Sequence, residues 1–200
     1  PRAARNMWLL PWAEQRYPQE LAAIRRDYPD DFDYPPIQYP KVDGMRGDPY
    51  ATGICVDEWG CEFISIQPGA IGEVKNPMIQ NYATDMAKLR PPVEWYDINL
   101  DPAGRLREKS DKFLLLGSPV RLFERMQFLR GTENLYIDLA EQPAELFKLR
   151  DIVHEWNVRM LERLVKADVD AISWMDDWGS QSSLLMSPKM WREFFKPCYR

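Results

Sequence analysis

Two adjacent acids follow a run of apolar and β-branched residues near the C-terminal end of the sequence. Residues 170–175 predict a buried strand, and Asp176 and Asp177 come directly after it. Catalytic groups in parallel α/β proteins gather at the carboxyl ends of strands, and only one of two adjacent side chains would face such a site. We predict that Asp176 and Asp177 are catalytic residues. Trp178 would then stack against the substrate, and Gln181 would donate hydrogen bonds to it.

A similar cluster of two acids, a tryptophan and a glycine occupies residues 57–60, in the first half of the sequence. We take Asp57 and Trp59 of this cluster as candidate substrate-binding residues. Here and at residues 176–177 the alternative is a structural role, because aspartate commonly fixes turns and caps helices. The sequence leaves both interpretations open.

Two arginines lie four residues apart, in a segment for which we predict a helix over 120–129. This spacing would place Arg121 and Arg125 on one face of the helix, just after a predicted strand. Two guanidinium groups there could bind substrate carboxylates through paired hydrogen bonds. The alternative is that these arginines form ion pairs with nearby acids such as Glu124 or Asp138.

The sequence offers few groups for a metal site or a nucleophile. Its one histidine, His154, falls in a predicted amphipathic helix, where we expect it in solvent or at the boundary of the core. Cys55 and Cys61 lack the CxxC spacing of zinc sites. Ser182 and Ser183 lack the flanking glycines of a nucleophile elbow. We therefore predict no metal ligands within these residues.

The spacing of apolar residues predicts the elements that would position these side chains. β-Branched and aromatic residues predict a hairpin over 53–57 and 61–67, and an apolar run predicts a strand over 112–116, buried on both faces. Apolar spacings of three and four, proline positions and a capping serine predict helices over 18–27, 80–89, 102–111, 120–129, 132–140 and 143–166, and one that begins at Ser187-Pro188. This alternation indicates an α/β fold with parallel strands, either a doubly wound sheet or a (β/α)8 barrel.

Composition argues against several classes of partner. The 26 basic and 31 acidic residues give a net charge of −5, without the basic run typical of nucleic-acid or membrane-surface binding. The longest apolar run, residues 113–116, is far shorter than the roughly 20 residues that span a bilayer. Three cysteines are too few for a disulfide framework. We therefore expect no nucleic acid, no membrane and a cytoplasmic location.

Several motifs in the second half of the sequence follow one pattern. They are Gly117-Ser118-Pro119, the strand ending in residues 175–178 (Met-Asp-Asp-Trp), and residues 184–188 (Leu-Leu-Met-Ser-Pro) with Trp191, Phe194, Phe195 and Pro197 beyond. In these motifs residues 110–200 resemble the uroporphyrinogen decarboxylase superfamily, which also includes cobamide-dependent methyltransferases. Residues 57–60 and 69–75 look similar to a less characterised branch of it, on weaker grounds.

The resemblance implies a (β/α)8 barrel. Such barrels need about 250 residues, and the 200 residues end inside a predicted helix. We therefore expect a partial barrel, truncated at its C-terminal side, with exposed strand edges. Residues 1–200 would form one incomplete barrel domain, with a loop-rich part over 1–110 and regular βα units over 111–200.

The resemblance also implies an activity, which we place first as decarboxylation, a lyase reaction, of a tetrapyrrole-type substrate. Asp176 and Trp178 match a Phe-Asp-Ser-Trp motif, in which Asp177 replaces the serine. The family's Phe-Ser-Asp motif does not occur, and Asp57 is the nearest acid in that region. The tyrosine expected after the glycine–proline turn falls at Arg125. This reaction uses an acid and a cationic group and needs no cofactor within these residues.

Two alternatives remain within the resemblance. One is a zinc-dependent methyltransferase that takes a methyl group from a corrinoid protein, with zinc and a corrinoid as cofactors and that protein as a partner. Its zinc-binding His-x-Cys motif would lie downstream of the matched segment. The other is a barrel that binds a tetrapyrrole or corrinoid as a small-molecule partner without converting it.

Overall fold

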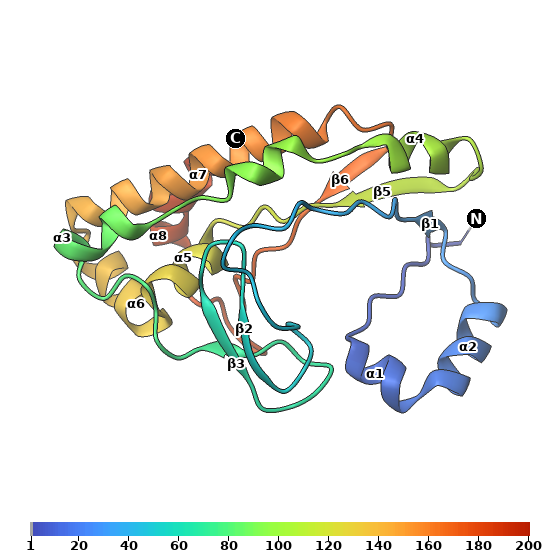
Figure 1. Ribbon diagram of the computed structural model, residues 1–200, viewed down its shortest axis with the longest axis horizontal. Helices are drawn as coiled ribbons and strands as arrows, with labels where there is room; N and C mark the ends of the chain where they lie inside the picture. The colour runs from blue at the N-terminus through green and yellow to red at the C-terminus, as the bar shows by residue number, and fades with distance from the viewer. Residues whose placement is uncertain (1) are drawn as a thin grey trace.

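The computed structural model describes residues 2–200 (Figure 1). It contains two three-stranded sheets. The parallel sheet has the order β1-β5-β6, with β1 Phe32–Asp33, β5 Phe113–Gly117 and β6 Ala171–Ser173. The antiparallel sheet has the order β2-β3-β4, with β2 Gly53–Val56, β3 Glu62–Ser65 and β4 Glu73–Val74. The predicted hairpin and both predicted parallel strands are therefore confirmed.

Helices and short helical turns connect the strands. The α-helices are α1 Pro11–Arg16, α2 Pro18–Asp27, α3 Tyr82–Asp85, α4 Asp101–Arg107, α5 Phe123–Arg130, α6 Thr132–Glu141, α7 Ala144–Leu164 and α8 Pro188–Met190. Further turns are η1 Met86–Lys88, η2 Val93–Asp97, η3 Trp191–Phe195 and η4 Lys196–Tyr199. The Ser187 side chain accepts a hydrogen bond from the Met190 amide, which confirms the predicted start of α8.

The core lies between the parallel sheet and the helices that follow β5. One face of α7 is fully buried, formed by residues spaced three and four apart: Leu146, Leu149, Val153, Trp156, Met160 and Leu164. In β5, Leu114 and Leu116 are buried, but Phe113 is 46% exposed. The prediction that this strand is buried on both faces is therefore wrong, because only the face carrying the two leucines is fully covered.

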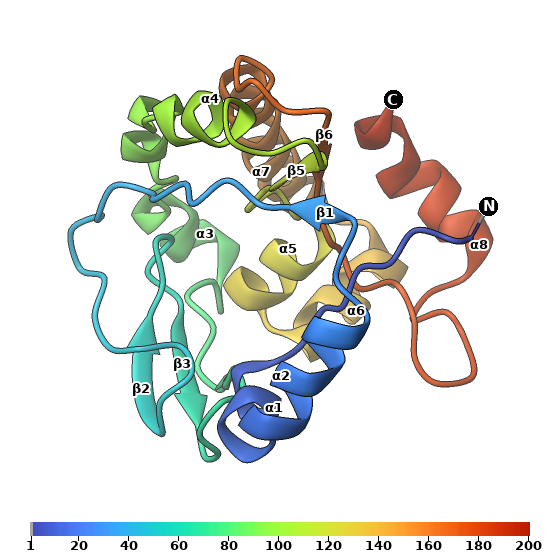
Figure 2. The same ribbon diagram turned by 90° about the vertical axis from the view of Figure 1, so that its right-hand side faces the viewer.

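The two sides of the parallel sheet carry different elements. Helices α4 and α7 lie on one side, and the β2–β3 hairpin with α1 and α2 lies on the other (Figures 1 and 2). The outer edges of β1 and β6 pair with no further strand in residues 2–200, so the parallel sheet is open. This part of the chain is a mixed α/β structure without a closed barrel. Within the same residues, no helix is both long and apolar enough to cross a membrane.

Candidate functional site

Charged residues from the hairpin and from α5 meet around a cavity of about 410 Å³. Asp57 and Glu58 come from the turn between β2 and β3. Glu124 and Arg125 come from the first turn of α5, and Arg121 from the loop before it. Phe63, Trp95 and Phe128 supply much of the apolar wall. We call this the acid–arginine cavity.

Arg125 is held between the two acids of the hairpin turn. One Nη atom donates to Asp57, and the other donates to Glu58 Oε1 at 2.6 Å. The guanidinium carbon lies 5.3 Å from the centre of the Trp59 ring, within range of a cation–π interaction. Burial works against the charge, but attraction to Asp57 and Glu58 outweighs it and raises the pKa of Arg125. The structure thus brings together the predicted residues Asp57, Trp59 and Arg125.

Asp57 also shapes the turn that presents it. Its Oδ1 atom accepts hydrogen bonds from the amides of Trp59 at 3.0 Å and Cys61 at 2.8 Å. Gly60 within this turn has a φ of +83°, a conformation that favours glycine. The two carboxylate oxygens are divided between the turn and Arg125, so Asp57 fixes the arginine to the hairpin.

Glu58 is the acid best suited to carry a proton. Its side chain is only 12% exposed, and burial together with the charge of Asp57 raises its pKa, although Arg125 opposes this shift. One guanidinium faces two carboxyl groups and can neutralise only one negative charge, so the other group holds a proton more readily. Glu58 therefore has the environment of a proton donor.

Arg121 is the less constrained cation of the cavity. Its side chain is 29% exposed, and its Nη1 atom lies 3.5 Å from Glu124 Oε2, in a loose ion pair. Burial raises the pKa of Glu124, and the nearby charge of Arg121 opposes this shift. Arg121 lies before α5 rather than on a shared helical face with Arg125, because the helix begins at Phe123 and not at residue 120.

Asp176 explains why α5 begins where it does. Its Oδ2 atom accepts from the amides of Leu122 at 2.9 Å and Phe123 at 2.7 Å, and its Oδ1 accepts from the Glu124 amide at 2.8 Å. The Tyr199 hydroxyl donates to the same carboxylate. Asp176 thus satisfies amides that a helix N-terminus leaves unpaired. This is the structural role set out above as the alternative, and a catalytic role for Asp176 remains a prediction.

None of the other predicted residues of this segment lines the acid–arginine cavity. Asp177 is exposed and accepts only a long hydrogen bond, 3.3 Å, from the Gly179 amide, and Gln181 is exposed. Trp178 stacks on Phe123, with ring centres 4.9 Å apart and planes 12° apart. Trp178 lines a separate, largely apolar cavity of about 410 Å³. The predicted site residues therefore fall into two groups, one that lines or adjoins the acid–arginine cavity and one in the segment that follows β6.

The donor groups of this part of the chain do not fit a zinc ion. In residues 2–200 no three side chains of His, Cys, Asp or Glu are placed to hold a metal together. Cys61 is buried and its sulfur contacts the guanidinium of Arg125, a cation that disfavours a metal ion at the same place. His154 lies on α7, whereas Cys55 lies on β2 and Cys61 in the turn before β3. The zinc-dependent methyltransferase alternative would therefore need metal ligands from outside residues 2–200.

Sequence reasoning missed the functional potential of two acids. Glu58 appeared only as a neighbour of Asp57 in a turn, and Glu124 only as an ion-pair partner of Arg121. Both line the cavity and both have raised pKa values, with burial as the first cause. Their burial depends on packing between segments more than sixty residues apart, and no local pattern signals it.

The fold and this site define an α/β protein in which acids and arginines from the hairpin turn and from the start of α5 line one cavity. The sequence model described as uroporphyrinogen decarboxylase (URO-D) matches residues 54–200. The chain belongs to the uroporphyrinogen decarboxylase family. Members of this superfamily are enzymes, decarboxylases or methyltransferases.

A solved structure supports the same relationship at the level of the fold. The chain resembles a methyltransferase from Methanosarcina mazei, with a TM-score of 0.55 and 20% sequence identity. The match covers 88% of this chain and 49% of that protein, so the chain spans about half the length of the methyltransferase. No curated protein matches the chain.

Proposed function

We propose that this chain forms part of a (β/α)8 barrel enzyme that removes a carboxyl group from a pyrrole-containing substrate with the help of Glu58 and Arg121. The observation that carries the proposal is Glu58, a buried acid with a raised pKa on the wall of a cavity that is also lined by Arg121, whose ion pair with Glu124 is loose. The fold likeness supports the barrel, and the family membership supports the reaction class.

The chemistry follows from the two groups. In the proposed reaction Glu58 donates its proton to a ring carbon of the pyrrole, which gives a cationic ring. The bond between the side-chain methylene and the carboxylate then breaks, its electron pair moves toward the ring, and CO2 leaves. The methylene carbon takes a proton from water, the hydroxide left behind combines with CO2 to give bicarbonate, and the ring proton returns to Glu58, which restores the acid.

Arg121 and Arg125 would have different tasks in this reaction. Arg121 would bind the carboxylate of the substrate, because its ion pair with Glu124 is loose and its side chain is 29% exposed. Arg125 would orient the acids, since both Nη atoms already donate to Asp57 and Glu58. At about 410 Å³ the cavity would take one ring with its side chains, and the remainder of a tetrapyrrole would extend beyond it.

The test is decarboxylation of uroporphyrinogen by the full-length protein, with carboxylated products separated by chromatography. Glu58→Gln keeps the shape but removes the transferable proton, and we expect at least a hundredfold lower kcat. Arg121→Ala should mainly raise KM. The matched control is Glu73→Gln, at an exposed ion pair on β4. If Glu58→Gln turned over like the wild type, the assignment of the acid would fail.

Methyl transfer from a corrinoid protein remains a second candidate, because the structural relative is a methyltransferase. In that reaction the thiol that accepts the methyl must lose its proton, which Glu58 in its charged form would take up, and the zinc ligands would have to come from outside residues 2–200. Metal analysis of the full-length protein and an assay with a methylated corrinoid separate the two candidates. Saturable binding of a tetrapyrrole or corrinoid without turnover would instead support a binding protein.

A further inference from the structure

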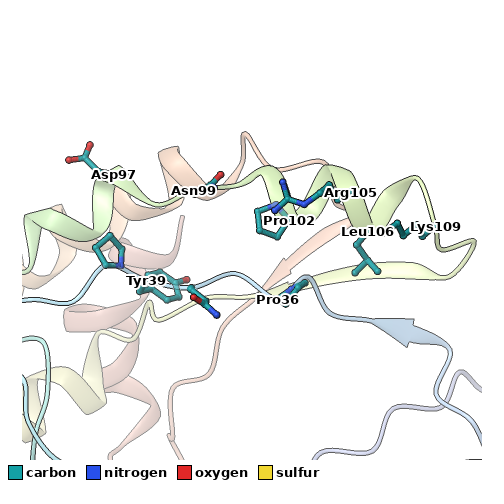
Figure 3. A pocket seen from close by; sticks show the side chains of 10 residues that line it. Pro36, Tyr39, Asp97, Asn99, Pro102, Arg105, Leu106 and Lys109 are labelled. Carbon is teal, nitrogen blue, oxygen red and sulfur yellow. The ribbon is translucent and has the colours of Figure 1, made fainter.

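Glu124 is a second acid of the acid–arginine cavity, and it has no task in the reaction proposed above. It lines this cavity together with Glu58 and Arg121. A larger cavity, of about 810 Å³, lies between α4 with η2 and the segment that follows β1, and none of these three residues lines it (Figure 3). Glu124 therefore shares its cavity with the two groups to which the reaction is assigned.

The backbone of Glu124 is fixed, while its carboxyl group remains accessible. The Glu124 amide donates to Asp176 Oδ1 at 2.8 Å, at the start of α5. The side chain is 22% exposed, and its Oε2 atom lies 3.5 Å from Arg121 Nη1. This is the one ion pair that Glu124 forms within residues 2–200. A molecule in the cavity can therefore contact both side chains of the pair.

Glu124 and a substrate carboxylate would compete for the same cation. The substrate carboxylate pairs with Arg121 in the proposed reaction, and one guanidinium balances only one negative charge. Burial raises the pKa of Glu124, and the charges of Asp176 and Asp177 add to this shift. The charge of Arg121 opposes the shift, as does that of Arg125 to a smaller extent. A carboxylate bound to Arg121 would cancel this opposition, so Glu124 would bind a proton.

We propose that Glu124 delivers the proton that replaces the carboxyl group on the methylene carbon, and that it takes up this proton when the substrate displaces it from Arg121. The methylene carbon is bonded directly to the carboxyl group, so a carboxylate held by Arg121 brings this carbon beside the Arg121–Glu124 pair. Glu58 is held by Arg125 and serves the ring instead. This inference rests on the proposed function.

The step balances in charge around Arg121. The bond to the carboxyl group breaks, CO2 leaves, and the electron pair of that bond forms a double bond between the methylene carbon and the ring. The same pair then forms the new C–H bond, as the O–H bond of Glu124 breaks. Glu124 is left as a carboxylate beside Arg121, which has just lost the carboxylate of the substrate. The proton from water thus reaches the methylene carbon through Glu124.

Titration calorimetry of the full-length protein with pyrrole-3-acetate tests the exchange at Arg121. Repeating the titration in buffers of different ionisation enthalpy, between about pH 5 and 8, measures the protons taken up for each ligand bound. The wild type and Glu58→Gln should take up a proton on binding, whereas Glu124→Gln should bind the ligand without uptake. Binding without uptake in the wild type, or with full uptake in Glu124→Gln, would overturn the inference.

Turnover of uroporphyrinogen by the full-length protein tests the delivery of the proton. Glu124→Gln should lower kcat about a hundredfold without raising KM, because glutamine keeps the size of the side chain but brings no charge to compete for Arg121. Glu124→Asp should recover part of the lost kcat, since it restores a carboxyl group. Glu133→Gln, at an exposed position on α6, is the matched control and should turn over like the wild type.

The outcomes separate this inference from the function on which it rests. Decarboxylation with an unchanged kcat in Glu124→Gln would overturn the role of Glu124 alone. A wild type that fails to bind pyrrole-3-acetate or to decarboxylate uroporphyrinogen would overturn the proposed function, and this inference with it.

Discussion

Removing the carboxylate of Asp176 should destabilise the protein through the start of α5. Asp176→Ala leaves the amides of Leu122, Phe123 and Glu124 without their acceptor, and the Tyr199 hydroxyl without a partner. Loss of a helix cap costs about 0.5–2 kcal/mol, and an unsatisfied buried hydroxyl adds about 1–3 kcal/mol. We expect the free energy of unfolding to fall by about 2–4 kcal/mol.

Urea denaturation followed by far-UV circular dichroism measures this effect. Asp177→Ala is the matched control, because its neighbouring carboxylate is exposed and accepts one long hydrogen bond; it should change stability by less than about 0.5 kcal/mol. Tyr199→Phe removes only the hydrogen bond between the hydroxyl and Asp176, so the free energy of unfolding should fall by less than in Asp176→Ala. If Asp176→Ala unfolded like the wild type but lost activity, Asp176 would be catalytic and its capping role of no consequence.

Three further predictions concern the ion pairs and the core. Arg125→Met leaves two buried carboxyl groups without their cation and should cost about 3–5 kcal/mol in urea unfolding; a loss below 1 kcal/mol would show that the pairs contribute little. Because the pKa of Glu58 is raised, the folded state holds this proton more tightly, so stability should fall as pH rises from the ordinary value of 4.5 through the raised one. Glu58→Gln should flatten that part of the pH profile, and an unchanged profile would contradict the shift. Leu114→Ala should cost about 2–5 kcal/mol, clearly more than Phe113→Ala, since Leu114 is fully buried and Phe113 is 46% exposed; equal losses would be inconsistent with the burial of β5.

The sequence pattern was enough to predict those helices that are determined by residues within the same segment. The apolar spacing of α7 and the proline and serine at the start of α8 are contained within each segment, and both helices form as expected. The start of α5 is different. Its cap comes from Asp176, more than fifty residues further along the chain, so the helix begins at Phe123 instead of residue 120.

The same distinction applies to the candidate site. The acid cluster at residues 57–60 and Arg125 stood out by residue type, but only the folded chain shows that they contact one another. The raised pKa of Glu58 depends on its burial, and the side chain shares the guanidinium of Arg125 with Asp57. The spacing of residues in the sequence reveals neither of these features. The two acids at 176–177 looked equivalent in sequence, yet one caps a helix and the other is exposed.

The proton on Glu58 is tested most directly by NMR titration of the labelled glutamate side-chain carbons, with Glu58→Gln used to assign the signal. The structure predicts a midpoint for Glu58 above the ordinary value of 4.5, because the carboxyl is buried beside Asp57. A midpoint at or below 4.5 would mean that Arg125 holds Glu58 in its charged form, and would contradict its proposed role as the proton donor.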